Sequence, residues 1–464
     1  MIPRKKERPS YSRPAEERGR SDIPEPPRGR RRLLWLGPGF LWMVSATGSG
    51  ELLFTPRVAA LYGYALLWGL LAAVLLKWFI NREVGRFAVC TGVSLLDGFS
   101  KLPGPRNWAV WLILVPQLLV AATTVAGLAS AAATALILIL PGEIRLWTAG
   151  LISLSAFLVL KGHYRIIERI ATAVAILLAV LVLTAALLLF PDPAALAEGL
   201  IPRLPPNVDY GEVLPWLGFM LSGAAGFIWY SFWIPRKGYG AAGARRAASE
   251  EGVDSSSAGR QRLRGWLTQM TLDNTVGVIG ALAIAIAFLI LGAELLKPRG
   301  LVPDEDRVAA TLGHLLGGVW GPAGYWFMVA GVLIGFWGTV LSVQDGFSRL
   351  LGTGTRLLVA PLHPGGRWGD EAFWRRVYLI GWVTLFPIVL FFFVGKPVGL
   401  LKLAGGIEAA HIPIVAGLTL YLNRRRLPPE LQPSRPAFLA TTLAALFFAG
   451  FALVYLWSLF TPEG

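Results

Sequence analysis

Apolar runs long enough to cross a lipid bilayer recur along this 464-residue chain, from residue 33 to residue 460. A bilayer core of about 30 Å takes about 20 apolar residues as a helix. In lipid the backbone polar groups must be satisfied inside the protein, which a helix does within a single segment. Hydrophobic residues make up 55% of the chain, and its mean hydropathy is +0.57. The chain is therefore predicted to be an all-α membrane protein.

Eleven transmembrane helices are expected, and the third and eighth are long enough to require tilt or to project from the bilayer. They are 33–61, 64–90, 108–140, 146–160, 166–190, 214–234, 266–296, 308–351, 374–394, 398–423 and 437–460. The predicted domains are a disordered basic tail at 1–32, a first five-helix repeat at 33–190, an extracytoplasmic loop at 191–213, a second five-helix repeat at 214–423 with a cytoplasmic linker at 235–265, and a loop with the eleventh helix at 424–464.

The formal net charge of +15 is concentrated in the tail and in alternate loops. Lysine and arginine favour cytoplasmic loops, so this pattern indicates orientation in a membrane and argues against nucleic-acid binding. The N-terminus is expected in the cytoplasm and the C-terminus outside, in a multi-pass protein of the inner (cell) membrane. Cys90 is the single cysteine, which rules out an intrachain disulfide. The sequence holds no nucleophile triad, no phosphate-binding loop with a lysine and no cofactor fingerprint, so neither an enzyme nor a cofactor is expected.

Glycine and hydroxyl residues interrupt two of the expected spans at similar depth. The residues at these interruptions are Thr47, Gly48, Ser49, Gly50 and Glu51 in the first span, and Ser222, Gly223, Ala225, Gly226 and Phe227 in the sixth. Spans one and six occupy equivalent places in a repeat of five helices, and paired broken helices of this kind form the substrate site of many transporters. These ten residues are therefore the predicted substrate-binding site. The alternative is that Gly223 and Gly226 only permit close packing of helices.

Four segments, taken in order, carry a resemblance to a known family. They are Gly37-Pro38-Gly39-Phe40-Leu41, Gly63-Tyr64-Ala65-Leu66-Leu67-Trp68, Tyr164-Arg165 with Glu168-Arg169, and Leu272-Asp273-Asn274-Thr275. Together they resemble the Nramp family of proton-coupled divalent-metal transporters, over the first ten spans. The resemblance implies a LeuT-type fold, with a 5+5 inverted repeat, broken helices one and six, and alternating access.

The sequence departs from the Nramp pattern at the two interruptions. Where the family has Asp-Pro-Gly-Asn, this chain has Gly48 to Glu51, and the Met-Pro-His of the family is missing around Gly226. A soft-metal site needs a thioether or imidazole near a carboxylate. The resemblance therefore does not carry transition-metal binding over to this chain, and no metal ligands are predicted.

The altered interruption favours a small inorganic anion, with bicarbonate first. A glycine-rich turn that leads into a helix presents free backbone N–H groups, here at Ser49, Gly50 and Glu51. One alternative is a divalent-cation carrier for Mg²⁺ or Mn²⁺ that uses Glu51 and backbone carbonyls, because hard cations prefer oxygen ligands. Another is a membrane sensor that does not transport. The expected partners are the ion and the lipid bilayer, and the chain is expected to work as a monomer.

Four residues are candidates for carrying a coupling charge. Glu51 leads, because an ionised carboxylate inside a membrane is costly unless it meets a proton or a cation. Glu408 and His411 lie three residues apart and share a helix face, as a proton relay or as a core pair. Asp273 is expected to serve structure more than coupling. Lys77 in span two is expected to extend its ammonium group toward the cytoplasm.

Overall fold

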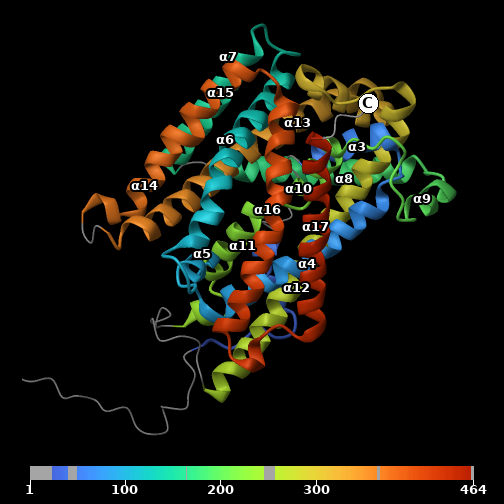
Figure 1. Cartoon of the computed structure of the whole chain (residues 1–464). Coiled ribbons are helices and arrows are strands. Elements are labelled where there is room, and N and C mark those ends of the chain that lie inside the picture. The colour runs from blue at the N-terminus through green and yellow to red at the C-terminus, as the bar shows by residue number, and fades with distance from the viewer. Residues whose placement is uncertain (1–22, 40–49, 163–164, 245–255, 363–365, 461–464) are drawn as a thin grey trace, which may run out of the picture.

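The computed structural model describes residues 23–39, 50–162, 165–244, 256–362 and 366–460, and over these residues its regular elements are all helical. The long helices in Figure 1 are α4 (Leu67–Thr91), α6 (Trp108–Leu136), α7 (Ile144–Lys161), α8 (Arg165–Leu188), α12 (Ser257–Leu291), α13 (Val308–Val359), α16 (Pro397–Arg426) and α17 (Arg435–Phe460). Three spans are composite: η2 (Gly50–Phe54) with α3 (Thr55–Tyr62), α10 (Tyr210–Phe219) with α11 (Ala224–Lys237), and α14 (Glu371–Val377) with η8 (Tyr378–Leu385) and α15 (Phe386–Val394).

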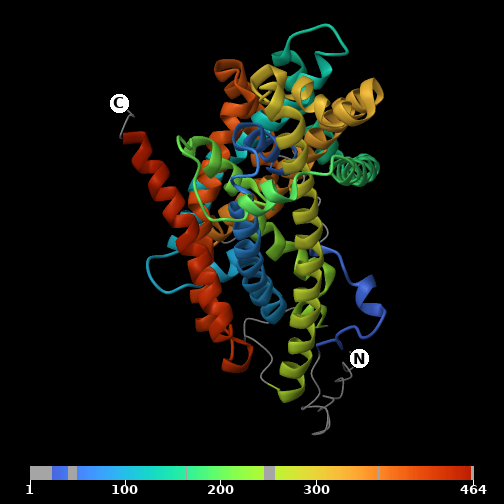
Figure 2. The same cartoon turned by 90° about the vertical axis from the view of Figure 1, so that its right-hand side faces the viewer.

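Short helices cover the ends of the bundle. They are α1 (Arg31–Leu34), α5 (Leu95–Phe99), α9 (Pro193–Gly199), η3 (Gly240–Gly243), η4 (Gly292–Leu296), η5 (Lys297–Arg299), η6 (Glu305–Arg307), η7 (Arg367–Gly369) and η9 (Pro429–Leu431). Helix α1 and the last turns of α17 lie at opposite ends of the molecule, as an odd number of spans requires (Figure 2).

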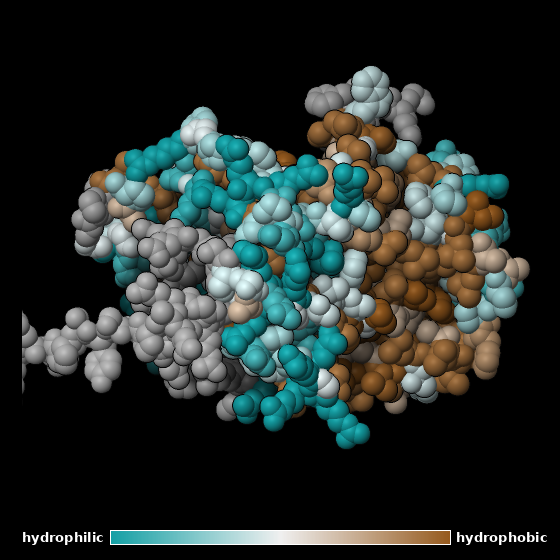
Figure 3. All heavy atoms as spheres, turned by 90° about the horizontal axis from the view of Figure 1, so that it is seen from below, coloured by the Kyte–Doolittle hydropathy of each residue, from teal (hydrophilic) through white to brown (hydrophobic). Residues whose placement is uncertain are grey.

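Nine helices in the described part of the chain are long and apolar enough to cross a membrane. The two other spans are α4, whose apolar character is lowered by Lys77, Arg82, Glu83 and Arg86, and the first span, described as η2 and α3. The all-α prediction is confirmed, with a LeuT-type 5+5 inverted repeat followed by one further helix. Helices α6 and α16 form the centre, whereas α7, α8 and α17 are largely exposed on the flanks. Viewed from below, hydrophobic residues cover one flank and hydrophilic residues gather over the end (Figure 3).

The eighth span differs from the continuous helix that was predicted. The backbone leaves the helical region at Trp320 and at Gly321, whose φ is 63°. A left-handed φ is accessible to glycine at little cost, and Pro322 cannot donate the hydrogen bond that would continue the preceding helix. Helix α13 is therefore two helices joined at an angle, so the long span needs less tilt than its length suggested.

Helices extend into both ends of the segment predicted as a linker, and the described end of the predicted tail packs on the bundle. Helix α11 extends to Lys237, and α12 begins at Ser257, where the Ser256 hydroxyl accepts a hydrogen bond from Gly259 N–H at 2.9 Å. Such a serine caps the free N–H groups of a helix start. The end of the tail packs on α12: Trp266 Nε1 donates to the Pro24 carbonyl at 2.8 Å, and Ile23 is buried. Residues 1–22 of the tail lie outside the described residues.

Candidate functional site

The sixth span is broken between α10 and α11. Helix α10 ends at Phe219, α11 starts at Ala224, and the connection runs through Leu221, which has a φ of 60°. A positive φ is uncommon for a residue other than glycine and marks a backbone held by its surroundings. The break exposes the carbonyls at the end of α10 and the N–H groups at the start of α11, which need partners elsewhere.

The carbonyls of the break are bound by Lys77, from the middle of α4. Its Nζ donates to the carbonyl oxygens of Gly218 at 2.8 Å, Met220 at 2.6 Å and Ser222 at 2.7 Å. The side chain is fully buried. The expectation that Lys77 would reach toward the cytoplasm is therefore wrong: the unpaired carbonyls are the nearest strong acceptors for its ammonium group, and they satisfy it inside the protein.

Glu51 faces the same break from the first span. Its Oε1 accepts a hydrogen bond from Leu221 N–H at 2.9 Å, and the residue is completely buried. Its second oxygen, Oε2, has no hydrogen-bond partner among the described residues. A buried acceptor without a partner is costly, so this oxygen is free to take a proton or a cation.

Glu408 reaches the break from α16. Its Oε2 accepts from Ala225 N–H at 3.1 Å and from Gln117 Nε2 at 3.3 Å. Gln117 Nε2 also lies 3.0 Å from His411 Nδ1, so the amide joins the two α16 side chains. The predicted relationship between Glu408 and His411 therefore runs through Gln117, a residue that the sequence analysis did not select.

A small cavity of about 40 Å³ lies between the broken sixth span and its neighbours. Ser222, Gly223, Ala225 and Gly226, which belong to the predicted substrate site, line it together with Glu408. Its other lining residues include the hydroxyl-bearing Thr124 and Thr339, and the aromatic Trp229. Oxygen groups thus dominate its polar lining, and Thr124 Oγ1 has no partner in the described part of the chain.

Gly223 makes room for the Glu408 carboxyl group. A Cβ atom on Gly223 would lie 2.5 Å from Glu408 Cδ, closer than two carbons can approach. Gly223 thus permits close packing and also shapes the site, because the group that packs against it is the Glu408 carboxylate that lines the cavity. Phe227, also predicted for the site, is buried in α11 and does not line the cavity.

The remaining predicted site residues lie around the first span. Thr47, Gly48 and Ser49 fall outside the described residues. Gly50 lies where the first span crosses the broken sixth span, and a Cβ there would be 2.8 Å from the Phe219 carbonyl oxygen. Asp273 accepts hydrogen bonds from Gly37 N–H at 2.8 Å and Gly39 N–H at 2.6 Å, and does not line the cavity. These bonds hold Gly37 and Gly39 at the start of the first span.

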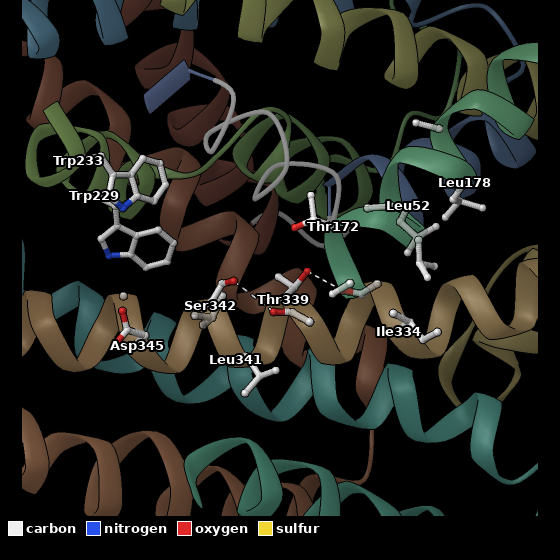
Figure 4. A pocket seen from close by; sticks show the side chains of 18 of the residues that line it. Leu52, Thr172, Leu178, Trp229, Trp233, Ile334, Thr339, Leu341, Ser342 and Asp345 are labelled. Carbon is white, nitrogen blue, oxygen red and sulfur yellow. Dashed lines mark hydrogen bonds between the residues drawn. The ribbon is translucent and has the colours of Figure 1, made fainter. Parts of the chain in front are cut away.

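A larger cavity of about 550 Å³ opens beside the small one, and Trp229, Thr339 and Val343 line both. In Figure 4, Thr339, Ser342 and Asp345 of α13 point into it, opposite Thr172 of α8. Arg236, Lys237 and Arg349 also line it. We name the end of the molecule that carries these three residues the basic end.

Asp345 is the acidic residue of this larger cavity, and it is already engaged. It is bonded to Arg349 at 2.7 Å and also to Arg375. The basic side chains Arg236 and Lys237 therefore leave the cavity with an excess of positive charge at the basic end. The larger cavity, which shares Trp229, Thr339 and Val343 with the small one, lies on this side.

The opposite end is fastened by an ion-pair network centred on Glu212. The Arg57 guanidinium donates to both Glu212 oxygens, at 2.8 and 2.7 Å, and Lys402 Nζ lies 2.6 Å from Oε1. Arg57 also bonds the Pro303 carbonyl and lies 3.2 Å from Asp304. These contacts connect α3, α10 and α16 beyond the break. The structure is therefore held closed by ion pairs at this end and contains the large cavity at the basic end.

A broken sixth span with polar groups at its midpoint, which the first span crosses at Gly50, points to a transporter of a particular class. The model of the Nramp family, described as natural resistance-associated macrophage protein-like, matches residues 39–458. The chain belongs to the Nramp family. It is a membrane transporter and not an enzyme, as expected.

Relatives of this Nramp protein are similar at modest identity. An uncharacterised protein of Pasteurella multocida is 24% identical over 407 residues, covering 83% of this chain and 84% of that protein. The divalent metal cation transporter MntH of Deinococcus radiodurans is 31% identical over 183 residues, covering 38% of this chain and 41% of that protein. MntH of Brucella suis is 28% identical over 324 residues, covering 68% of this chain and 66% of that protein.

Solved structures share the fold. A mutant of the Eremococcus coleocola manganese transporter superposes with a TM-score of 0.68 at 16% identity, covering 95% of this chain and 91% of that one. Mhp1, a nucleobase-cation-symport-1 family transporter, superposes with a TM-score of 0.53 at 14% identity, covering 92% and 93% of the two chains. The similarity extends over both five-helix repeats and confirms the LeuT-type architecture.

Proposed function

We propose that this Nramp protein is a secondary-active transporter that carries a hard divalent metal cation, such as Mg²⁺ or Mn²⁺, through the break between spans one and six. The observation that carries the proposal is the carboxylate of Glu408 in the cavity at that break, which the hydroxyl-bearing residues Thr124, Ser222 and Thr339 also line. Carboxylate, carbonyl and water oxygens suit Mg²⁺, Ca²⁺ and Mn²⁺. The names of the MntH relatives support the same class of substrate.

The donor set favours a hard cation over a soft one. Methionine and histidine are missing from the residues that line the small cavity. Met220 contributes its carbonyl to Lys77 and keeps its side chain in the core. Among the described residues, no three or more His, Cys, Asp and Glu side chains are grouped as a metal site. The cation would therefore keep part of its water shell, as Mg²⁺ commonly does.

Bicarbonate, the substrate first favoured from the sequence, has less support. An anion in this break would lie beside the carboxylates of Glu51 and Glu408, which raises its free energy unless both carry a proton or a cation. The ammonium of Lys77 is already engaged by three carbonyls. The divalent-cation alternative thus agrees better with the carboxylates and with the relatives.

The same proposal includes coupling and orientation. Glu51, with its free Oε2 atom, is the group that would carry a coupling proton. The N-terminus and the basic end lie in the cytoplasm, and the C-terminus outside, because lysine and arginine are retained in cytoplasmic loops. The large cavity is then the cytoplasmic exit path of a monomer in the cell membrane.

Flux into proteoliposomes tests the substrate. We expect saturable uptake of Mg²⁺ and Mn²⁺ and weaker uptake of Cd²⁺, a softer ion. Glu408→Gln should abolish uptake, and Glu430→Gln, at an exposed position far along the chain from the break, should behave as wild type. Labelled bicarbonate that accumulates without any metal flux would instead establish the anion reading. A folded protein with no flux of either kind would favour the sensor.

A further inference from the structure

The buried ammonium group of Lys77 is bound by three backbone carbonyls of the broken sixth span. Its ammonium group has three N–H donors, and each is met by one carbonyl oxygen of the break, from Gly218, Met220 and Ser222. All three distances lie between 2.6 and 2.8 Å, and the side chain is fully buried. Gly218 and Met220 lie at the C-terminal end of α10, where the helix dipole is negative, and Ser222 lies in the connection to α11. This is the environment of a bound monovalent cation.

We propose that these three carbonyls form a monovalent-cation site, that Lys77 occupies it as a tethered cation, and that transport requires a positive charge there. The part of the inference that concerns transport rests on the function proposed above. The cation site itself does not, because it follows from the contacts of Lys77 alone.

The positive charge of Lys77 lies near two buried carboxylates. Glu51 from the first span and Glu408 from α16 both interact electrostatically with it. The ring of Phe448 on α17 closes the remaining side, with its centroid 5.4 Å from Nζ. Two carboxylates with no internal cation would be costly to hold together in a membrane. With Lys77 in place one carboxylate charge is compensated, and a divalent cation can enter and leave without the break ever holding two bare negative charges.

The rival account is that Lys77 only caps α10. A cap requires hydrogen-bond donors, whereas a tethered cation requires a positive charge. Substitutions can therefore distinguish these two roles of Lys77. Lys77→Gln keeps a donor group and removes the charge. Lys77→Ala removes both and opens space next to the carbonyls for a free methylammonium ion.

The experiment compares these two variants with wild type and with Lys161→Ala, a lysine that is exposed at the end of α7. Uptake of Mg²⁺ or Mn²⁺ into proteoliposomes and the midpoint of thermal unfolding in detergent are measured with and without methylammonium chloride. Tetramethylammonium chloride at equal concentration controls for ionic strength and is too large and too poor in N–H donors for the site.

We expect uptake by Lys77→Ala and Lys77→Gln to fall at least about tenfold. One uncompensated buried charge raises the free-energy barrier to transport by more than a tenfold decrease in rate requires. Methylammonium should restore uptake by Lys77→Ala and raise its unfolding midpoint, and it should leave Lys77→Gln and Lys161→Ala unchanged.

Two results would overturn the inference. One is wild-type uptake by Lys77→Gln, which would reduce Lys77 to a cap and decides the matter even where Lys77→Ala does not fold. The other is a folded Lys77→Ala variant in which methylammonium changes neither the midpoint of thermal unfolding nor uptake. If wild type itself carries no divalent cation, the proposed function fails, whereas the shift in midpoint still reports on the cation site.

Discussion

The network around Glu212 should hold the end opposite the basic end closed, and Glu212→Gln should open it. Arg57 and Glu212 have side chains only 9% and 6% exposed, so their charges are poorly screened. Removing one partner of a buried ion pair costs about 3–5 kcal/mol. The glutamine still accepts hydrogen bonds, and Asp304 remains 3.2 Å from Arg57. We therefore expect a net loss of about 2 kcal/mol for the closed form, roughly a thirtyfold shift in the equilibrium.

Cysteine labelling measures this shift. Thr55 is buried just beneath the network, and its Oγ1 accepts from Trp216 Nε1 at 3.0 Å, so Thr55→Cys places a thiol at the closed end. The natural Cys90 is buried and provides the background. A charged, membrane-impermeant thiol reagent should modify Thr55→Cys about thirty times faster when Glu212→Gln is added, because the rate follows the open fraction.

The matched control for this experiment is Glu294→Gln. Glu294 accepts a hydrogen bond from Tyr64 at 2.7 Å but contacts no cation in the described network. It should leave the labelling rate unchanged. Equal rates for Thr55→Cys with and without Glu212→Gln would refute the reasoning, since the ion pairs would then contribute nothing to closure.

Three further predictions concern the break itself. Gly223→Ala should fold yet lose uptake, because its methyl group would displace the Glu408 carboxyl that lies 2.5 Å from the new atom; flux and size-exclusion profiles measured together check this. Asp273→Asn should lower the free energy of unfolding by about 1–3 kcal/mol through weaker bonds to the first span, which a thermal melt detects. Glu51→Gln, which can still accept from Leu221, should keep substrate exchange and lose accumulation driven by a proton gradient.

Each of these has a contrary outcome. Normal uptake by Gly223→Ala would mean that Glu408 does not need its present position. An unchanged melting midpoint in Asp273→Asn would show that its two hydrogen bonds are exchanged for water without loss. Full gradient-driven accumulation by Glu51→Gln would remove the coupling role and favour a uniporter.

The spans and the break of the sixth span could be predicted from the sequence because both are local properties. Apolar length marks a helix in a membrane, and clustered glycines with a carboxylate mark its interruption. The Trp320-Gly321-Pro322 bend is equally local, since Gly-Pro is a strong breaker, but it lies inside a long apolar run whose composition favours a continuous helix. The partners of Lys77 and Arg57 could not be read this way, because they lie 141 and 155 residues further along the chain.

Lys77 shows why position in a helix does not settle the direction of a side chain. A lysine in a membrane helix reaches water if a path of apolar surface leads there. In this fold the broken end of α10 lies beside α4 and offers three unpaired carbonyls, which compete successfully with the distant solvent. The sequence contained both halves of this contact, a mid-span lysine and a broken helix. Only the packing of α4 against α10 and α11 joined them.

Gly50 decides which variants can discriminate between the substrates. Negative charge at Gly50 would be the natural test for an anion site, but any side chain there meets the Phe219 carbonyl oxygen, 2.8 Å from the Cβ position. Gly50→Asp would therefore abolish transport of an anion and of a cation alike, by separating the two broken spans. Variants that change charge without adding volume at the crossing avoid this ambiguity. Glu51→Gln, Glu408→Gln and Lys77→Gln meet that condition. A cation carrier should lose uptake in Glu408→Gln and Lys77→Gln, and only its gradient-driven accumulation in Glu51→Gln.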